Sequence, residues 1–423
     1  MTWISFICFI LLFILLFSLF KKETDVFSPA RLFLIIWSLA IGLADLKLSR
    51  YQINWTNYSW IMLLISLSSM LIGMFIVYVI NLDKPLKKIE SIRLSIKKNT
   101  FNSQMLFRYV VFLFIAYLVS YIVSALVIGF IPYFTLFPGV ARNDWGIFGF
   151  GLFVQSFPAV IYLSILYFII TKSQVYKKIW LVLILLITTA TYLLLLQRYY
   201  VVFAIILTAI SLYYFTNLLK VKNVIIFTII IFVSVFSMTF IRLTGTISNY
   251  LYYLSDMRFN IRYALFTEPY MYIVMNLENF AHAVDKVERF TYGLFSFDFV
   301  FALSGLKHEM VKYLSLPEFP NLLTNNYNTY TMFFIYYWDF GIIGLGIVPM
   351  ILGGLFSTAY YSMRRNPTIT SISIYSVFAF VIIFSFFIPI ISFLHFAFNF
   401  AVIYLVTKII SKPILKSELL IAT

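Results

Sequence analysis

The sequence predicts an all-α protein that crosses a membrane many times, and three observations support this. Of its 423 residues, 62% are hydrophobic and only 11% are charged, which is more apolar surface than a soluble domain of this size can bury. The apolar stretches run for about 20 residues, the length of helix that crosses a hydrocarbon core about 30 Å thick. They are continuous rather than alternating, which favours helices over the strands of a β-barrel.

We expect about eleven spans, with the N-terminus outside and the C-terminus inside. Lysine and arginine set this orientation, because the cytoplasmic loops of membrane proteins are rich in both. Most of the 31 basic residues fall on the predicted inner side, so the net charge of +15 indicates membrane topology rather than nucleic-acid binding. The predicted spans are residues 3–20, 30–46, 58–80, 105–128, 150–171, 179–196, 199–217, 223–241, 331–361, 370–390 and 392–410.

A long stretch of mixed polarity, residues 242–328, separates an N-terminal membrane region (1–241) from a C-terminal one (329–423). More than half of the 16 acidic residues lie between Arg242 and Gly341. We expect this stretch to lie at the outer face of the membrane, and we expect any chemistry to occur there.

Within this stretch, residues 268–290 are predicted to form an amphipathic helix. Pro269 suits a first helical turn, and Gly293 suits the left-handed position after a helix end. Apolar residues recur at helical spacing, and a second face carries four polar residues: Glu278, His282, Asp285 and Arg289. This face is either solvated, with the helix lying on the membrane or the bundle, or it lines a cleft in which a carboxylate beside an imidazole serves as a base.

Arginines on the predicted outer side form a second group of candidates. The planar arginine fork binds diphosphate through paired hydrogen bonds and keeps its charge. A single arginine is more often a membrane-interface anchor, but several around one outer surface favour an anionic substrate. The candidates are Arg142, Arg198, Arg242, Arg258, Arg262 and Arg289.

Asp339 is the least expected carboxylate, because an ionisable group at membrane depth is costly unless it is paired or functional. It either caps a helix that starts near Gly341 or belongs to the site. Motifs for metals and nucleotides are missing from the sequence, and Cys8 is its single cysteine, so we expect neither a metal nor a cofactor.

Four short segments resemble the bacterial O-antigen and capsule repeat-unit polymerases, the Wzy-type family. They are Met275–Phe280 (MNLENF), Tyr292-Gly293 (YG), Asn328–Thr331 (NTYT) and Asp339–Gly344 (DFGIIG). The specific similarity covers about residues 268–345, and many spans with one large outer loop are also typical of that family.

One departure from the family concerns arginine. Some members carry an arginine and a glycine with ten residues between them in two outer loops. Here that spacing occurs only at Arg31 and Gly42, next to the predicted cytoplasmic side, so those arginine roles are not carried over.

The resemblance implies a membrane-embedded, GT-C-like glycosyltransferase of the bacterial inner membrane, with its active site on the extracytoplasmic side. It would join undecaprenyl-diphosphate-linked oligosaccharide repeats without a metal and with inversion at the anomeric carbon. A base would deprotonate the acceptor hydroxyl, and cations would stabilise the leaving diphosphate. The bilayer surrounds such a substrate, and a chain-length regulator is left open as a partner. The base or sugar-positioning candidates are Glu278, His282 and Asp339; the substrate-binding candidates are the outer arginines with Asn328 and Tyr330.

Two alternatives remain. An O-antigen ligase would use the same chemistry with a lipid A-core acceptor. A flippase or transporter for lipid-linked sugar would move the substrate without joining it. The lack of internal repeats and the single large outer loop count against the transporter.

Overall fold

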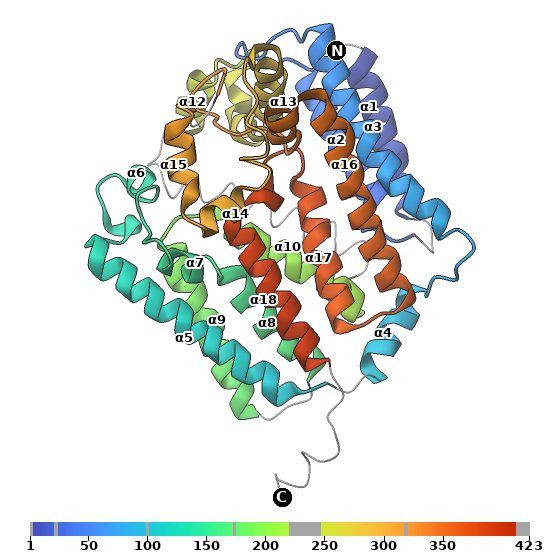
Figure 1. Cartoon of the computed structure of the whole chain (residues 1–423), viewed down its shortest axis with the longest axis vertical. Coiled ribbons are helices and arrows are strands. Elements are labelled where there is room, and N and C mark those ends of the chain that lie inside the picture. Colours follow the sequence, from blue (N-terminus) through green and yellow to red (C-terminus); the bar gives the residue numbers. More distant parts are fainter. Residues whose placement is uncertain are drawn as a thin grey trace, which may run out of the picture. The chain divides into compact units, whose positions relative to one another are not determined.

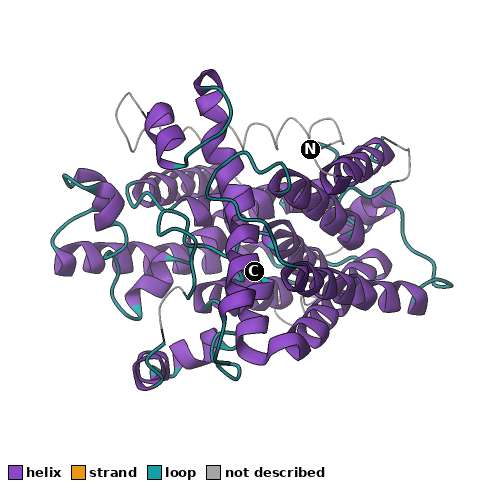
Figure 2. Cartoon of the chain, turned by 90° about the horizontal axis from the view of Figure 1, so that it is seen from above, coloured by secondary structure: helices purple, strands orange, loops and turns teal. Residues whose placement is uncertain are grey.

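The structure is a computed structural model of the chain, and it describes residues 3–20, 24–98, 101–171, 175–219, 247–316 and 320–411. Within these ranges, all regular secondary structure is helical, the helices are joined by turns and loops, and there is no strand (Figures 1 and 2). The all-helical fold is therefore confirmed for the described residues. Their apolar helices support a membrane-embedded chain, while the number and orientation of the spans stay predictions.

Six described helical segments are long and apolar enough to cross a membrane. They are α3 (Asn57–Ile80), α5 (Ser103–Ile128), α7 with α8 (Phe150–Val154, Phe157–Ile170), α9 (Val175–Leu193), α10 (Arg198–Phe215) and α16 (Phe333–Arg365). Four apolar helices are shorter: α1 (Trp3–Ser18), α2 (Pro29–Ala44), α17 (Ile369–Phe384) and α18 (Leu394–Ile410). Each overlaps a predicted span, and the predicted span 223–241 lies outside the described residues.

The other described helices are short or polar. They are α4 (Ile89–Lys98), α6 (Pro138–Ala141), α12 (Ile247–Leu254), α13 (Thr267–Lys286), α14 (Asp298–Leu303) and α15 (Leu306–Tyr313), with 3-10 turns at Pro132–Phe134, Ile261–Phe266 and Ile390–Ser392.

Two compact units are each assembled from segments far apart in the chain. The first contains Met1–Pro85, Thr239–Tyr361 and Val381–Phe396. The second contains Leu86–Met238, Ser362–Phe380 and Ala397–Thr423.

Helix α13 is the central helix of the first unit, where it packs against α2, α3 and α12. Its polar residues Asn276, Glu278 and Asn279 are as buried as its apolar ones. Side chains from other segments cover Glu278, so the interpretation of a solvated polar face is wrong at this residue, whereas Asp285 and Arg289 of the same predicted face are exposed.

The predicted end of this helix is also wrong. The helix stops at Lys286, and Val287 follows in an extended conformation. Gly293, which we expected to follow the helix end, adopts its left-handed φ of 99° inside a later turn. A β-branched valine favours extended backbone, so the chain leaves the helix before it reaches the glycine.

Helix α16 is two helices joined at Gly341, whose φ of 62° and ψ of −145° suit only glycine. The break separates a short helix, residues 333–340, from the long apolar one, residues 342–365. The long helix crosses α3 at close range. A Cβ at Gly73 would lie 1.9 Å from the Met350 carbonyl oxygen, and a Cβ at Gly353 would lie 2.1 Å from that of Met70. Glycines on both helices thus allow their backbones to touch, as in many membrane bundles.

In the second unit, α8 packs against α5, α9 and α10. An aromatic cluster fills this packing, including Tyr117, Tyr121, Trp145, Phe157 and Tyr192. The connection between the predicted spans 58–80 and 105–128 contains a helix that the sequence did not reveal, α4. It buries Ile92 and Ile96, and the Arg93 guanidinium donates to the Tyr213 carbonyl at 2.6 Å.

Candidate functional site

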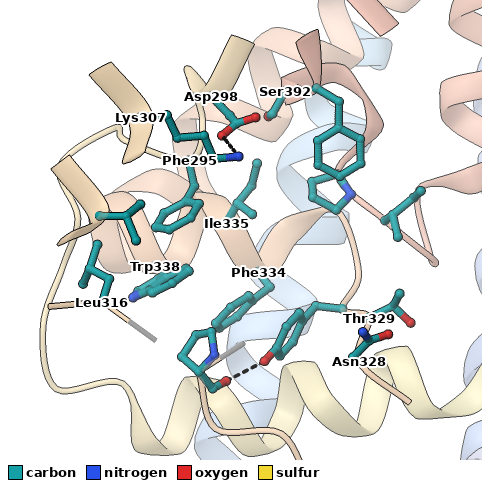
Figure 3. Close-up of a pocket in the computed structure, with 16 residues that line it drawn as sticks. Phe295, Asp298, Lys307, Leu316, Asn328, Thr329, Phe334, Ile335, Trp338 and Ser392 are labelled. Carbon is teal, nitrogen blue, oxygen red and sulfur yellow. Dashed lines mark hydrogen bonds and ion pairs between the residues drawn. The ribbon is translucent and has the colours of Figure 1, made fainter. Parts of the chain in front are cut away.

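A cavity of about 530 Å³ lies in the first unit (Figure 3). Its walls come from the turn at 295–298, from α15, from residues 328–330, from the short helix 333–340 and from residues 388–393. The volume falls within the about 300–1,000 Å³ of typical small-ligand sites. All of the lining residues belong to one compact unit.

Four aromatic rings form a stacked row along the cavity. Phe334 and Trp338 are one helical turn apart, and Tyr330 precedes them by the same spacing. Ring centroids lie 4.2 Å apart for Tyr330 and Phe334, 5.7 Å for Phe334 and Trp338, and 4.1 Å for Trp338 and Phe295. Adjacent ring planes differ by 23° at most. Tyr330 is fixed further because its hydroxyl donates to the Pro320 carbonyl at 2.6 Å, and burial raises the pKa of Tyr330, which keeps that hydroxyl protonated.

The polar lining groups gather at two places in the cavity (Figure 3). At one, the Lys307 ammonium lies 2.5 Å from the Asp298 carboxylate, with Ser392 nearby. The Asp298 side chain is 10% exposed and that of Lys307 36%. At the other, Asn328 and Thr329 border the cavity. Asp298 and Lys307 are the two charged residues among the described side chains that line it.

Asp339 organises the turn that carries Phe295. Its carboxylate accepts hydrogen bonds from the Thr291 hydroxyl, from the Phe295 N–H at 3.3 Å and from the Ser296 N–H at 2.5 Å. The break at Gly341 frees the last carbonyls of the short helix, and the backbone N–H groups of Thr291 and Tyr292 donate to two of them, those of Trp338 and Asp339. Asp339 therefore does not cap the following helix, which was one prediction. It ties the 291–296 turn to the short helix.

Two asparagines of α13 hold the segment that precedes the short helix. The Asn279 amide donates to the carbonyls of Tyr327 at 2.6 Å and of Thr329 at 2.9 Å, and its oxygen accepts from the Leu323 N–H at 3.3 Å. The Thr329 hydroxyl donates to the Asn276 side-chain oxygen. These bonds place Asn328 and Tyr330, both predicted to bind substrate, at the cavity.

Glu278 lies elsewhere in the first unit, fully buried, with four donors on its carboxylate. The Lys47 ammonium is 2.5 Å away, the Gln52 amide 3.0 Å, the Trp55 indole N–H 2.9 Å and the Ile53 N–H 3.1 Å. Four donors on one carboxylate occupy most of its accepting capacity. These contacts give Glu278 a structural task, which is to fasten the 47–55 loop to α13. The catalytic role expected for it stays a prediction.

His282 and Asp285 lie one turn further along α13. Burial and, to a lesser extent, Lys286 lower the pKa of His282, while Asp285 raises it. The Asp285 carboxylate accepts from the hydroxyls of Thr56 at 2.9 Å and Ser59 at 3.0 Å, at the start of α3. In the described part of the chain, neither residue lines the cavity.

The predicted arginines are not gathered at the cavity. Arg258, Arg262 and Arg289 are exposed in the first unit and are not among its described lining residues. Arg142 and Arg198 belong to the second unit. Arg242 lies outside the described residues. Their binding of diphosphate therefore stays a prediction.

Several cavity residues were missed in the sequence. The spacing of four between Tyr330, Phe334 and Trp338 is a helical signal that could have identified the aromatic row. Asp298 and Lys307 stand nine residues apart, on two short helices, and no motif signals such a pair.

Comparison of the chain with protein-family models, with curated proteins and with solved structures finds no match. The function therefore has to be argued from the geometry of the site and from the motif segments around it.

Proposed function

We propose that this chain is a membrane-embedded glycosyltransferase that joins lipid-linked oligosaccharide repeats, as the Wzy-type polymerases do. One observation carries the proposal. The four motif segments, which are scattered over about 70 residues of sequence, form two hydrogen-bonded pairs beside one cavity. Asn276 and Asn279 hold the NTYT segment, whose Asn328, Thr329 and Tyr330 line the cavity. The Tyr292 N–H donates to the carbonyl of Asp339, which begins the DFGIIG segment and directly follows the lining residue Trp338.

The chemistry needs an acceptor hydroxyl, a donor sugar on diphosphate and a base. In the proposed reaction, the acceptor oxygen attacks the anomeric carbon and forms the new glycosidic bond. The bond from that carbon to the diphosphate oxygen breaks, and the diphosphate leaves with the electron pair. Asp298 takes the proton, because it is the carboxylate among the described cavity-lining residues and Lys307 occupies only part of its accepting capacity.

The leaving diphosphate requires positive charge. We assign this task to the predicted outer arginines, of which Arg258 and Arg262 are exposed and free of any carboxylate ion pair among the described residues. The extracytoplasmic face of a bacterial inner membrane is part of this proposal, since undecaprenyl-diphosphate-linked repeats are polymerised there in the family that the motifs resemble.

The test is an assay with the purified full-length chain and a lipid-linked repeat isolated from cells that lack this chain. With EDTA and without nucleotide, we expect a ladder of products on a gel. Asn279→Ala should weaken the ladder strongly, because the segment 323–329, which leads into the cavity wall, loses three hydrogen bonds. The control, Asn325→Ala, removes an exposed asparagine from the same segment and should leave the ladder intact.

Other outcomes would redirect the assignment. A full ladder from the Asn279→Ala variant would move the active site away from this cavity. If no ladder forms while the repeats cross a liposome bilayer, the chain is a flippase. Transfer of a preformed glycan onto lipid A-core would identify a ligase.

A further inference from the structure

We propose that the cavity binds an uncharged, hydroxyl-rich ring, a neutral pyranose, and that it excludes phosphate and acidic sugars. Asp298 and Lys307 are the residues that set this preference. The inference deepens the proposed function and rests on it for the view that the ring belongs to a lipid-linked glycan.

The charge of the lining supports a neutral ligand. Asp298 and Lys307 form an ion pair at 2.5 Å and cancel each other. A phosphate or carboxylate entering the cavity would either share the Lys307 ammonium with the Asp298 carboxylate, which repels it, or draw Lys307 away from Asp298. Drawing Lys307 away would leave an Asp298 carboxylate that is 10% exposed without its counter-charge, which is costly in a largely apolar environment. A hydroxyl group needs no such exchange, since it can donate to the carboxylate and accept from the ammonium at the same time.

The aromatic row supports a ring with an apolar face. Phe295, Trp338, Phe334 and Tyr330 line the cavity together, and their mutual stacking fixes their positions. A pyranose presents C–H groups on its faces and hydroxyls at its edge. The C–H groups can pack against aromatic surface, while the edge hydroxyls reach polar groups.

The polar groups at the two places in the cavity match such an edge. Asp298, Lys307 and Ser392 lie together at one (Figure 3). Asn328, with both a donor and an acceptor on its amide, lies at the other. A ring between them would be oriented by hydrogen bonds at both sides.

The positions of the arginines separate two kinds of recognition. Arg258, Arg262 and Arg289, all in the same unit, are not among the described residues that line the cavity. The cavity therefore binds the sugar, and the diphosphate is held outside the cavity. The sugar preference should then be measurable with free sugars that carry no lipid and no phosphate.

The experiment is ligand-observed NMR, by saturation transfer, on the purified full-length chain in detergent. The probes are a set of neutral methyl pyranosides, methyl glucuronide and inorganic phosphate, with competition among them. We expect saturation of the ring C–H protons of at least one neutral pyranoside, and at least tenfold weaker binding of the glucuronide and of phosphate.

Two variants test the ion pair without removing an aromatic ring. Asp298→Asn leaves Lys307 uncompensated, so the preference for neutral over acidic sugar should shift by about tenfold toward the acidic one. Lys307→Met should weaken the binding of the neutral sugar and still exclude the glucuronide. The control is Glu288→Gln, which removes one exposed negative charge from the same unit and should change neither preference.

Binding of phosphate or glucuronide by the unaltered chain at least as tightly as of the pyranosides would overturn the inference. So would an unchanged preference in the Asp298→Asn variant, or a product ladder from a chain that binds no pyranoside. Pyranoside binding with the expected preference, in a chain that forms no ladder with any lipid-linked repeat, would support the neutral-sugar cavity and count against the proposed polymerase.

Discussion

Replacing Glu278 by glutamine tests whether its carboxylate has a structural or a catalytic role. Glutamine has nearly the same shape, but it removes the charge and turns one acceptor atom into a donor. Because all four groups around the carboxylate are donors, at least one pair of them loses its acceptor. The Lys47 ammonium also loses its counter-charge.

The magnitude follows from burial. Breaking a buried ion pair by removing one partner costs about 3–5 kcal/mol. The Lys47 side chain is 21% exposed and its ammonium lies 5.2 Å from the Trp55 ring centroid, so it keeps some compensation. We therefore expect the lower end, about 3 kcal/mol of unfolding free energy. Glu278→Gln should cost at least about 1 kcal/mol less in a Lys47→Met background than in the unaltered chain, since partners in contact are not additive.

The assay is unfolding of the purified chain by SDS titration, followed by tryptophan fluorescence, beside the ladder assay. Glu288→Gln, which changes an exposed carboxylate, is the matched control and should keep full stability. The structural reasoning is refuted if Glu278→Gln keeps the stability of the unaltered chain and still loses product formation, because that combination marks a catalytic base.

Three further changes probe other parts of the first unit. Asp339→Asn should lower the unfolding free energy by about 2 kcal/mol, because an amide cannot accept from the Thr291 hydroxyl and from the N–H groups of both Phe295 and Ser296. Amide hydrogen exchange should also rise at residues 291–296, and unchanged exchange there would contradict this reasoning. Gly341→Ala should lower the unfolding free energy by about 1–3 kcal/mol, because the φ of Gly341 is 62° and a Cβ there would lie 3.0 Å from the Phe290 ring. The control is Gly346→Ala, which has open space around it and should leave the unfolding free energy nearly unchanged. Equal effects of the two substitutions would rule out backbone strain at Gly341. Burial lowers the pKa of His282 below the ordinary 6.5, so the folded chain favours the neutral imidazole and its stability should fall as the pH drops below that value. His282→Gln should therefore flatten the plot of unfolding free energy against pH over about pH 5 to 8. An unchanged slope would assign the effect to other groups.

The membrane helices could be predicted because the apolar runs are long and nothing competes with that signal. Every described span-length helix overlaps a predicted span, to within a few residues at each end. The break at Gly341 was expected only in part. The sequence Asp339-Phe340-Gly341 indicated that a helix starts there, but not that a separate short helix precedes it. Helix α4 was missed because its charges dominate a stretch in which two isoleucines make the tertiary contacts.

The site was harder to predict, because partners far apart in sequence decide the role of each polar residue. The pattern of α13 placed Glu278 beside His282, yet among the described contacts the charge partner of Glu278 is Lys47, more than 200 residues away. Helical spacing shows which residues share a face but not what covers that face. Asn328 and Tyr330 could be named from their segment alone, whereas their place at the cavity depends on Asn276 and Asn279.

The number of donors on each carboxylate is what distinguishes the acids of the first unit. Glu278 accepts from four groups and Asp339 from three, all within the protein, and these bonds give each carboxylate a fixed structural task. Asp298 instead has one ammonium partner, which is itself a third exposed, and it lies on a cavity wall. A carboxylate can act on a substrate only with accepting capacity left over and with a path to it. By that criterion, the acid that attracted no notice in the sequence is the one best placed for chemistry.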